Sequence, residues 1–213
     1  MKYSALIVAA GQGTRLNLGY NKIFYKLNNE KTILDTVLET FFNDEKCQQL
    51  VVVLNSQDLY QQSKCQLTGK TVYVLGGKRR QDSVLNGLMA VTEKYVLIHD
   101  GARPYLKQEL INSVLNKLEE HQACIPVVAL KDTIKKVNND EVIETLDRNQ
   151  LAAIQTPQGF HTDVIFKAYL KAEEAKLEVT DDAQVIELTS DVSVATVLGD
   201  YSNLKITTEE DLA

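Results

Sequence analysis

The chain has 213 residues, 44% of them hydrophobic, so it is long enough to bury a core and fits one domain over residues 1–213 better than two. Its formal net charge of -6 argues against a surface built to bind nucleic acid, which usually needs clustered Lys and Arg. The three cysteines, Cys47, Cys65 and Cys124, are too far apart to suggest a zinc site or a disulfide framework. Free thiols fit a cytoplasmic protein.

The apolar run at residues 5–10 resembles the core of a signal peptide, but it leads into a glycine-rich loop rather than a cleavage site. We therefore expect it to be a first β-strand. No apolar stretch approaches the roughly 18 residues needed to span a bilayer, so we expect a soluble protein with no membrane partner.

Apolar runs of strand length recur along the first part of the chain and predict strands at 5–10, 49–55, 71–77, 95–100 and 123–130. These runs do not alternate with polar residues, which is typical of strands covered on both faces. Helical periodicity appears between them at 32–44, 82–91 and 108–121. Alternating strands and helices predict an α/β fold with a mainly parallel sheet.

The alternation is interrupted at residues 131–146, where two β-rich pieces flank Asn138, Asn139 and Asp140. This pattern predicts a β-hairpin within a projecting arm at about 131–150, since Asn and Asp tolerate tight turns. An isolated two-stranded arm is marginally stable, so we expect it to pack against something, such as a second subunit.

The remaining elements follow this arm. We expect a helix at about 162–176, a short acidic helix N-capped at Thr180, a strand within 192–199 and the start of a capped helix at 207–212.

The loop "AAGQGTRLNLGYNK", residues 9–22, follows the first predicted strand. Glycines at such a strand end let backbone N–H groups approach an anion. The loop is not a Walker A motif, and Leu16 stands where the dinucleotide fingerprint has its third glycine. Arg15 and Lys22 beside Gly11 and Gly13 would suit a triphosphate. The alternative is that both are solvated loop cations.

Seven blocks, in order along nearly the whole chain, resemble the 2-C-methyl-D-erythritol 4-phosphate cytidylyltransferase family. They are the loop at 9–22, "GGKRRQDSVLNGL" (76–88), "LIHDGARP" (97–104), "KDTIK" (131–135), "LDRNQLAAIQTPQGF" (146–160), "VTDDAQVIE" (179–187) and "GDYSNLKITTEEDL" (199–212).

The resemblance implies a homodimer, joined through the β-arm, with a Rossmann-like nucleotidyltransferase sheet. It also implies an Mg²⁺-dependent reaction, with the ion held mainly by CTP phosphates and not by a protein metal site. The enzyme would join CTP to 2-C-methyl-D-erythritol 4-phosphate, releasing pyrophosphate and 4-diphosphocytidyl-2-C-methyl-D-erythritol for non-mevalonate isoprenoid synthesis.

The same resemblance assigns roles to individual residues. Arg15 and Lys22 would contact the triphosphate and stabilise the α-phosphorus. The residues implied to bind the nucleotide are Ala9, Ala10, Gly11, Gly13, Gly77 and Ser83, with Gly76 and Arg80 in support. Those implied to bind the sugar phosphate or line its crevice are Asp100, Ala102, Arg103, Thr133, Arg148, Thr156, Thr180 and Lys205. Thr133 and Arg148 lie on or beside the arm, which would cross to the partner subunit.

Elementary chemistry agrees with this assignment. A phosphate is already anionic at neutral pH, so attack on an α-phosphorus needs alignment and charge neutralisation more than a strong base. Asp100 could bind a sugar hydroxyl, orient metal-bound water or cap the next segment, and we favour the hydroxyl. We expect His99 to be structural. Lys78 and Arg79 are expected to be solvated, and the alternative for Lys205 is a plain salt bridge to the acidic segment that follows.

Some residues depart from the family pattern. Asn21 and Ile23 flank Lys22 where many relatives have proline and glutamine, and Ser202 stands where an acidic residue is frequent. Two other functions remain open: a ribitol 5-phosphate cytidylyltransferase, whose relatives resemble "DSVRP" or "DAVRP" where this chain has "DGARP", and a non-catalytic nucleotide-binding protein.

Overall fold

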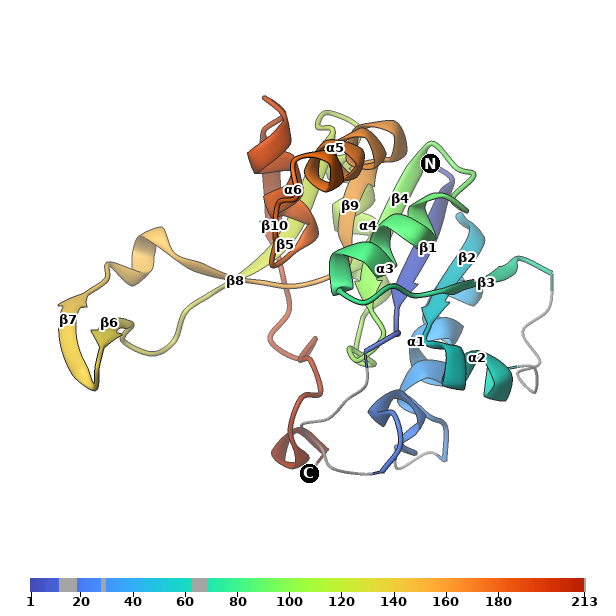
Figure 1. Ribbon diagram of the computed structural model, residues 1–213, viewed down its shortest axis with the longest axis horizontal. Helices are drawn as coiled ribbons and strands as arrows, with labels where there is room; N and C mark the ends of the chain where they lie inside the picture. Colours follow the sequence, from blue (N-terminus) through green and yellow to red (C-terminus); the bar gives the residue numbers. More distant parts are fainter. Residues whose placement is uncertain (12–18, 28–29, 63–68, 213) are drawn as a thin grey trace.

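A computed structural model describes residues 1–11, 19–27, 30–62 and 69–212 of the chain. Its main sheet has the order β10-β5-β9-β4-β1-β2-β3, with β8 paired to β5 (Figure 1). The strands are β1 (Tyr3–Val8), β2 (Cys47–Leu54), β3 (Thr71–Leu75), β4 (Tyr95–Asp100), β5 (Ala123–Ala129), β8 (Ala152–Ile154), β9 (Gln158–His161) and β10 (Val194–Leu198).

Most neighbouring strands in this sheet are parallel, as the sequence predicts. The exceptions are β9, which runs antiparallel between β4 and β5, and β8, which runs antiparallel to β5. The first strand, β1, pairs in parallel with β2 on one side and β4 on the other. It therefore lies inside the sheet, and Ala9, where the glycine-rich loop begins, lies at the inner part of one sheet edge.

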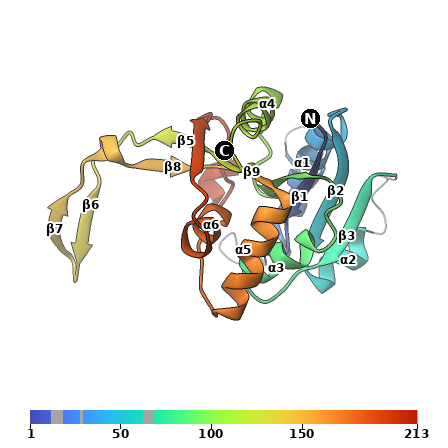
Figure 2. The same cartoon turned by 90° about the horizontal axis from the view of Figure 1, so that it is seen from above.

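Helices cover both faces of the sheet (Figure 2). Helices α1 (Ile33–Phe42) and α4 (Gln108–Lys117) pack on one face, and α3 (Arg80–Leu88), α5 (Thr162–Glu174) and α6 (Asp182–Thr189) pack on the other. Each face has its own buried apolar cluster. This double cover explains why the parallel strands read as continuous apolar runs.

Helix α1 shows how local sequence sets an element. The Thr32 side chain accepts a hydrogen bond from the Asp35 backbone N–H, and the Asp35 carboxylate accepts one from the Thr32 N–H. This capping box fixes the start of the helix. The predicted apolar face is the one that enters the core, because its residues Ile33, Leu34, Val37, Leu38 and Phe41 are all buried.

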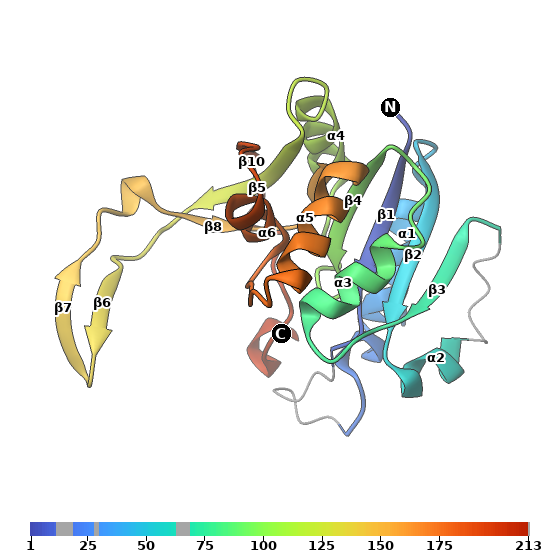
Figure 3. The same cartoon turned by 45° about the horizontal axis from the view of Figure 1, so that its top comes forward.

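The hairpin consists of β6 (Lys135–Asn138) and β7 (Glu141–Thr145), an antiparallel pair outside the main sheet. Asn139 and Asp140 turn the chain with φ of 47° and 65°, a conformation that Asn and Asp tolerate better than most residues. Figure 3 shows the hairpin extending away from the sheet and its helices. Its apolar residues Val137, Val142 and Ile143 are exposed.

Several local predictions differ from the structure. Helix α2 (Ser56–Gln62) was not predicted, and the last helix is a 3-10 turn, η4 (Glu209–Leu212). The N-cap of α6 is Asp181, whose carboxylate accepts from the Gln184 N–H, and not Thr180. Among the described residues, no helix combines the length and apolarity needed to cross a membrane.

Candidate active site

A cavity of about 320 Å³ opens at the carboxyl ends of β1 and β4, beside the turn between β3 and α3. Residues distant in sequence meet there because parallel strands end at the same sheet edge, where ligands of open α/β sheets commonly bind. The cavity is lined by Val8, Ala9, Ala10, Gly11, Asn21, Lys22, Ile23, Gly77, Lys78, Arg79, Arg80, Ser83, Asp100, Ala102 and Lys205. We call this cavity the pocket.

The turn before α3 forms one wall of the pocket and depends on two glycines. A Cβ atom at Gly76 would collide with the Cβ of Ala10, and one at Gly77 would collide with Asp82. The Gly77 N–H donates to the Ser83 hydroxyl (3.0 Å), which itself donates to the Arg79 carbonyl (3.1 Å). Ser83 therefore holds the turn that lets backbone approach a ligand.

Asp100, the last residue of β4, lies at the centre of a group of cations. Its carboxylate is 2.9 Å from Lys205 Nζ, 3.5 Å from Arg80 and 3.7 Å from Arg103 Nε. Burial alone would raise the pKa of Asp100, but Arg80, Lys205 and Arg103 outweigh it and hold that pKa well below its usual range. Asp100 is therefore ionised at neutral pH and fixes positively charged groups at the pocket.

Arg80 is held from behind by a buried carboxylate. Its two terminal nitrogens donate to the two oxygens of Asp182 at 2.9 and 2.8 Å, and Tyr169 donates its hydroxyl to the same carboxylate at 2.6 Å. Asp182 is fully buried. This bidentate pairing fixes the plane of the guanidinium and aims it toward Asp100.

Lys22 begins the 3-10 helix η2 (Lys22–Phe24) and is almost fully buried. Its Nζ donates to the carbonyl of Ile206 at 2.6 Å. Ile206 belongs to the segment after β10, which returns along the molecule to the glycine-loop end of the sheet (Figure 1). There the Ile206 N–H donates to the Ala102 carbonyl (2.9 Å), so this segment joins Lys22 to the end of β4.

His99, next to Asp100 in β4, is structural as expected. It is fully buried and points to the other side of the strand, where its Nε2 contacts the Arg103 carbonyl (3.1 Å) and its Nδ1 contacts the Thr156 hydroxyl (3.0 Å). Burial lowers the pKa of His99 from 6.5 to about 4, so the ring is neutral at physiological pH.

Two predicted site residues lie behind the pocket wall and do not line it. The Thr156 hydroxyl accepts the backbone N–H of Asp100 (3.1 Å), and Arg103 donates to the Asn203 carbonyl (2.7 Å). They support Asp100 and the segment at residues 200–206. Thr180 is also absent from the lining, since it is exposed and donates to the Gln184 side chain.

Thr133 and Arg148 lie on the arm, where both are exposed, and Arg148 donates to the Lys131 carbonyl (2.7 Å). Neither lines the pocket of its own chain. Gly13 and Arg15 lie outside the described residues, so their predicted contacts with the nucleotide stay predictions.

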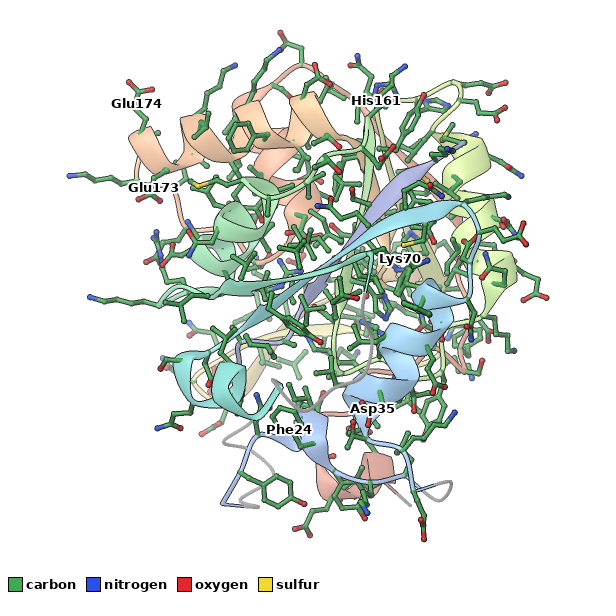
Figure 4. All side chains as sticks on the ribbon, turned by 90° about the vertical axis from the view of Figure 1, so that its right-hand side faces the viewer. Phe24, Asp35, Lys70, His161, Glu173 and Glu174 are labelled. Atoms are coloured by element: carbon green, nitrogen blue, oxygen red, sulfur yellow. The ribbon has the colours of Figure 1, made fainter. Side chains whose placement is uncertain are left out.

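Lys78 and Arg79 are exposed, as expected, and both also line the pocket. Arg79 is also tied into the surface, because it pairs with Asp82 (2.6 Å) and with Glu173 (3.2 Å). Figure 4 shows Glu173 at the C-terminal end of α5, so this pair connects the start of α3 to that helix.

Sequence reasoning missed two partners that organise the pocket. The sequence predicts a short acidic helix beginning at Thr180, but it does not indicate that Asp182 is buried against Arg80 or that the Ile206 carbonyl accepts from Lys22. Two adjacent acids at 181 and 182 provide a weak signal, because only one of them is needed as a cap.

The side chains that the structure describes around the pocket suit an anion better than a metal ion. Of the described residues that line it, Asp100 alone is a carboxylate, and that carboxylate is already paired with cations. No group of three or more potential metal ligands occurs within the described part of the chain. Such a donor set fits a magnesium ion that takes most of its ligands from substrate phosphates and water.

Comparisons with known proteins agree with this geometry. A family described as 2-C-methyl-D-erythritol 4-phosphate cytidylyltransferase matches residues 3–213. The chain is similar to proteins with that name from Bacillus cytotoxicus (42% identity, covering 99% of this chain and 94% of the relative) and Geobacillus kaustophilus (42%, covering 100% and 94%).

Solved structures of proteins with the same name are also similar. The structure from Francisella tularensis has a TM-score of 0.87 and 31% identity, covering 100% of this chain and 97% of the other. The structure from Thermus thermophilus has a TM-score of 0.84 and 31% identity, covering 100% and 96%.

Proposed function

The chain belongs to the 2-C-methyl-D-erythritol 4-phosphate cytidylyltransferase family, and we propose that it transfers a cytidylyl group from CTP to 2-C-methyl-D-erythritol 4-phosphate. The products are 4-diphosphocytidyl-2-C-methyl-D-erythritol and pyrophosphate. The observation that carries this proposal is the convergence of Lys22, Arg80 and Lys205 on one pocket beside closely approaching backbone.

In the proposed reaction, a phosphate oxygen of the sugar phosphate forms a bond to the α-phosphorus of CTP. The bond from that phosphorus to the oxygen bridging to the β-phosphorus breaks, and pyrophosphate leaves with the bonding electrons. No proton has to move, because the attacking phosphate is already anionic. The protein must therefore align two anions and neutralise the charge that builds up between them.

The residues divide this work between them. Ala9, Ala10, Gly11 and Gly77 offer backbone close to the nucleotide, and Lys22, together with Arg15 of the glycine loop, would stabilise the triphosphate. Lys205 and Arg80 bring positive charge to the boundary between the two substrates, at Asp100. One carboxylate oxygen of Asp100 can still accept a sugar hydroxyl, since ion pairs leave carboxylate lone pairs available.

In this proposal, Mg²⁺ binds as a complex with CTP. When bound through the phosphates it would neutralise part of their charge and orient them. The described lining would leave the coordination of this ion mainly to the substrate. We expect activity to require added Mg²⁺ and to stop in excess chelator, measured as pyrophosphate release.

We further propose that two copies of the chain assemble through the arm, so that Thr133 and Arg148 complete the sugar-phosphate site of the partner. Support comes from their exposure on the arm, at the base of a hairpin that extends away from the sheet (Figure 3), and from the exposed apolar residues Val137, Val142 and Ile143 of that hairpin. A monomer measured by light scattering at micromolar concentration would contradict this assembly. The cytoplasmic location stays a prediction from the cysteines.

The decisive experiment compares substrates side by side. Purified protein, CTP and Mg²⁺ are incubated with 2-C-methyl-D-erythritol 4-phosphate or ribitol 5-phosphate, and pyrophosphate release is measured. We expect turnover with the first. Equal or greater turnover with ribitol 5-phosphate would reassign the substrate, and no release with either would indicate a non-catalytic nucleotide-binding protein.

A further inference from the structure

We propose that Asn21 and Asp58 are positioning residues that hold Lys22 in the pocket through a buried hydrogen-bonded tether. This inference rests on the proposed function, because the role of Lys22 at the triphosphate belongs to it. The tether joins three elements that are separate in sequence: the end of β1, the start of η2 and the first turn of α2.

Both polar atoms of the Asn21 side chain form hydrogen bonds at the edge of the pocket. Its Oδ1 accepts the Ile23 N–H (3.3 Å), which caps η2, while its Nδ2 donates to the Ala9 carbonyl (3.3 Å) and to Asp58 Oδ2 (2.6 Å). Asn21 is only 7% exposed. The residue directly before Lys22 is thereby bonded to the residue that begins the glycine-rich loop.

Asp58 is the anchor of this tether. It is 6% exposed, and the same carboxylate oxygen that binds Asn21 also accepts the side-chain amide of Asn55 (2.5 Å). Asn55 in turn accepts the backbone N–H of Asp58 (2.9 Å) at the start of α2. Burying a carboxylate is costly unless it is hydrogen-bonded. A buried carboxylate whose hydrogen bonds go to Asn21 and Asn55 therefore indicates that the position of Asn21 matters.

Lys22 is therefore restrained both at its backbone and at its side-chain ammonium. The Asn21 tether fixes its backbone, and the Ile206 carbonyl receives its ammonium. Beyond η2, the Tyr25 carbonyl accepts the Ile33 N–H (3.0 Å), which ties the turn to α1. Figure 4 shows Phe24 of η2 and Asp35 of α1 at the same end of the molecule.

The backbone conformation of Asn21 suggests a variant that restrains the backbone without the side-chain hydrogen bonds. Its φ is -66°, the value to which a proline ring confines a residue. Asn21→Pro would therefore restrain the backbone of the loop without any side-chain hydrogen bond. Asn21→Ala removes both the tether and the restraint.

The test measures steady-state kinetics and CTP·Mg²⁺ binding by titration calorimetry. For Asn21→Ala and Asp58→Leu we expect affinity and kcat/KM for CTP to fall by about tenfold or more, because small misplacements of a positioned group are costly. The KM for the sugar phosphate should change little. Asn21→Pro should recover most of the loss, and Asn116→Ala, an exposed asparagine on α4, should match the unaltered protein.

A Lys22→Ala background distinguishes positioning from general damage to the fold. If the tether acts through Lys22, Asn21→Ala should cause no further loss once Lys22 is gone. An undiminished effect in that background, unchanged CTP binding in Asn21→Ala, or an equal rise in both KM values would overturn the inference.

The proposed function can fail separately from the tether. If the unaltered protein binds CTP but releases no pyrophosphate with either sugar phosphate, the reaction is wrong, and calorimetry still tests the tether. If the unaltered protein does not bind CTP at all, both proposals are wrong.

Discussion

The pocket and the arm carry two halves of the predicted site, and the chain holds them in different ways. In the pocket, Arg80 pairs with Asp182, Lys205 with Asp100, and Lys22 with the Ile206 carbonyl. On the arm, Arg148 is exposed and donates to a neighbouring backbone carbonyl. The charges of the pocket are thus preorganised by the fold of one chain, which lowers the cost of organising them during a reaction.

A single chain can complete the pocket but not, in our proposal, the part of the site that the arm provides. Helix α6, which packs on the sheet, brings Asp182 to Arg80, and strand β4 of the sheet brings Asp100 to Lys205, so building the core and building the pocket are one process. The arm buries little of itself, and in our proposal its residues acquire a binding role only against a second copy. Changes in the pocket should therefore alter stability and chemistry in each subunit, and changes on the arm should act across the dimer.

The largest effect is expected from breaking the pair behind Arg80. Asp182→Ala would leave the guanidinium and the Tyr169 hydroxyl without their shared buried partner, and it should lower the free energy of unfolding by about 3 kcal/mol or more. Urea denaturation measures this loss. Asp182→Asn keeps the shape and one hydrogen-bonding oxygen but removes the charge, so it should cost nearly as much as Asp182→Ala; a much smaller cost for Asp182→Asn would mean that the charge pair is unimportant.

Removing Lys22 should damage chemistry rather than folding. Lys22→Ala is expected to lower kcat/KM by about 2.7–4 kcal/mol of transition-state stabilisation, by analogy with loss of an oxyanion donor. The matched control is Lys26→Ala, which changes an exposed lysine of the same segment and should leave kcat/KM unaltered. Normal turnover in Lys22→Ala would remove this residue from the mechanism.

Elements with a local sequence pattern are predictable from the sequence, whereas elements set by long-range packing are not. Continuous apolar runs predict strands that are buried on both faces, and the apolar face of α1 predicts a helix that is buried on one face. Both patterns are visible in the spacing of neighbouring residues in the sequence. Helix α2 was missed since "SQDLYQQ" has no repeated apolar face. The antiparallel insertion of β9 depends on close packing at Gly159, next to Val114, Leu118 and Leu97, which no local pattern reveals.

The site follows the same rule. Lys22, Asp100 and Lys205 could be proposed from their motifs, since each follows or flanks a recognisable strand end or block. The residues that hold them could not, because Asp182 is 102 positions from Arg80, and Ile206 is 184 positions from Lys22. Such pairings arise only when the chain folds back on itself.

Acidification should destabilise the region beneath the pocket through His99. The folded protein keeps His99 neutral down to a pKa of about 4, whereas the unfolded chain takes up the proton near pH 6.5. Between these values the unfolded state binds more protons, so stability falls as the pH falls, by about 3 kcal/mol over the window. His99→Gln cannot take up this proton.

The measurement is the free energy of unfolding at pH 7 and pH 4.5 for both proteins. The unaltered protein should lose more stability than His99→Gln, while the nearby Asp100 stays ionised in both because its cation partners outweigh its burial and hold its pKa low. Parallel pH profiles for the two proteins would show that His99 does not titrate in this way. The arm contains no histidine, so this effect belongs to the pocket side alone.

The smallest effect is expected on the arm, and it tests whether the arm crosses between subunits. Arg148→Ala should raise the KM for the sugar phosphate by about tenfold, since hydrogen bonds to charged groups contribute about 1.5–3 kcal/mol. In mixed dimers of Arg148→Ala and Lys22→Ala subunits, the subunit with an intact Lys22 receives an intact Arg148 from its partner. Activity should therefore reappear in the mixture, compared with each variant alone. If mixing recovers nothing although mixed dimers form, Arg148 serves the pocket of its own chain, and the division between a self-contained pocket and a shared arm is wrong.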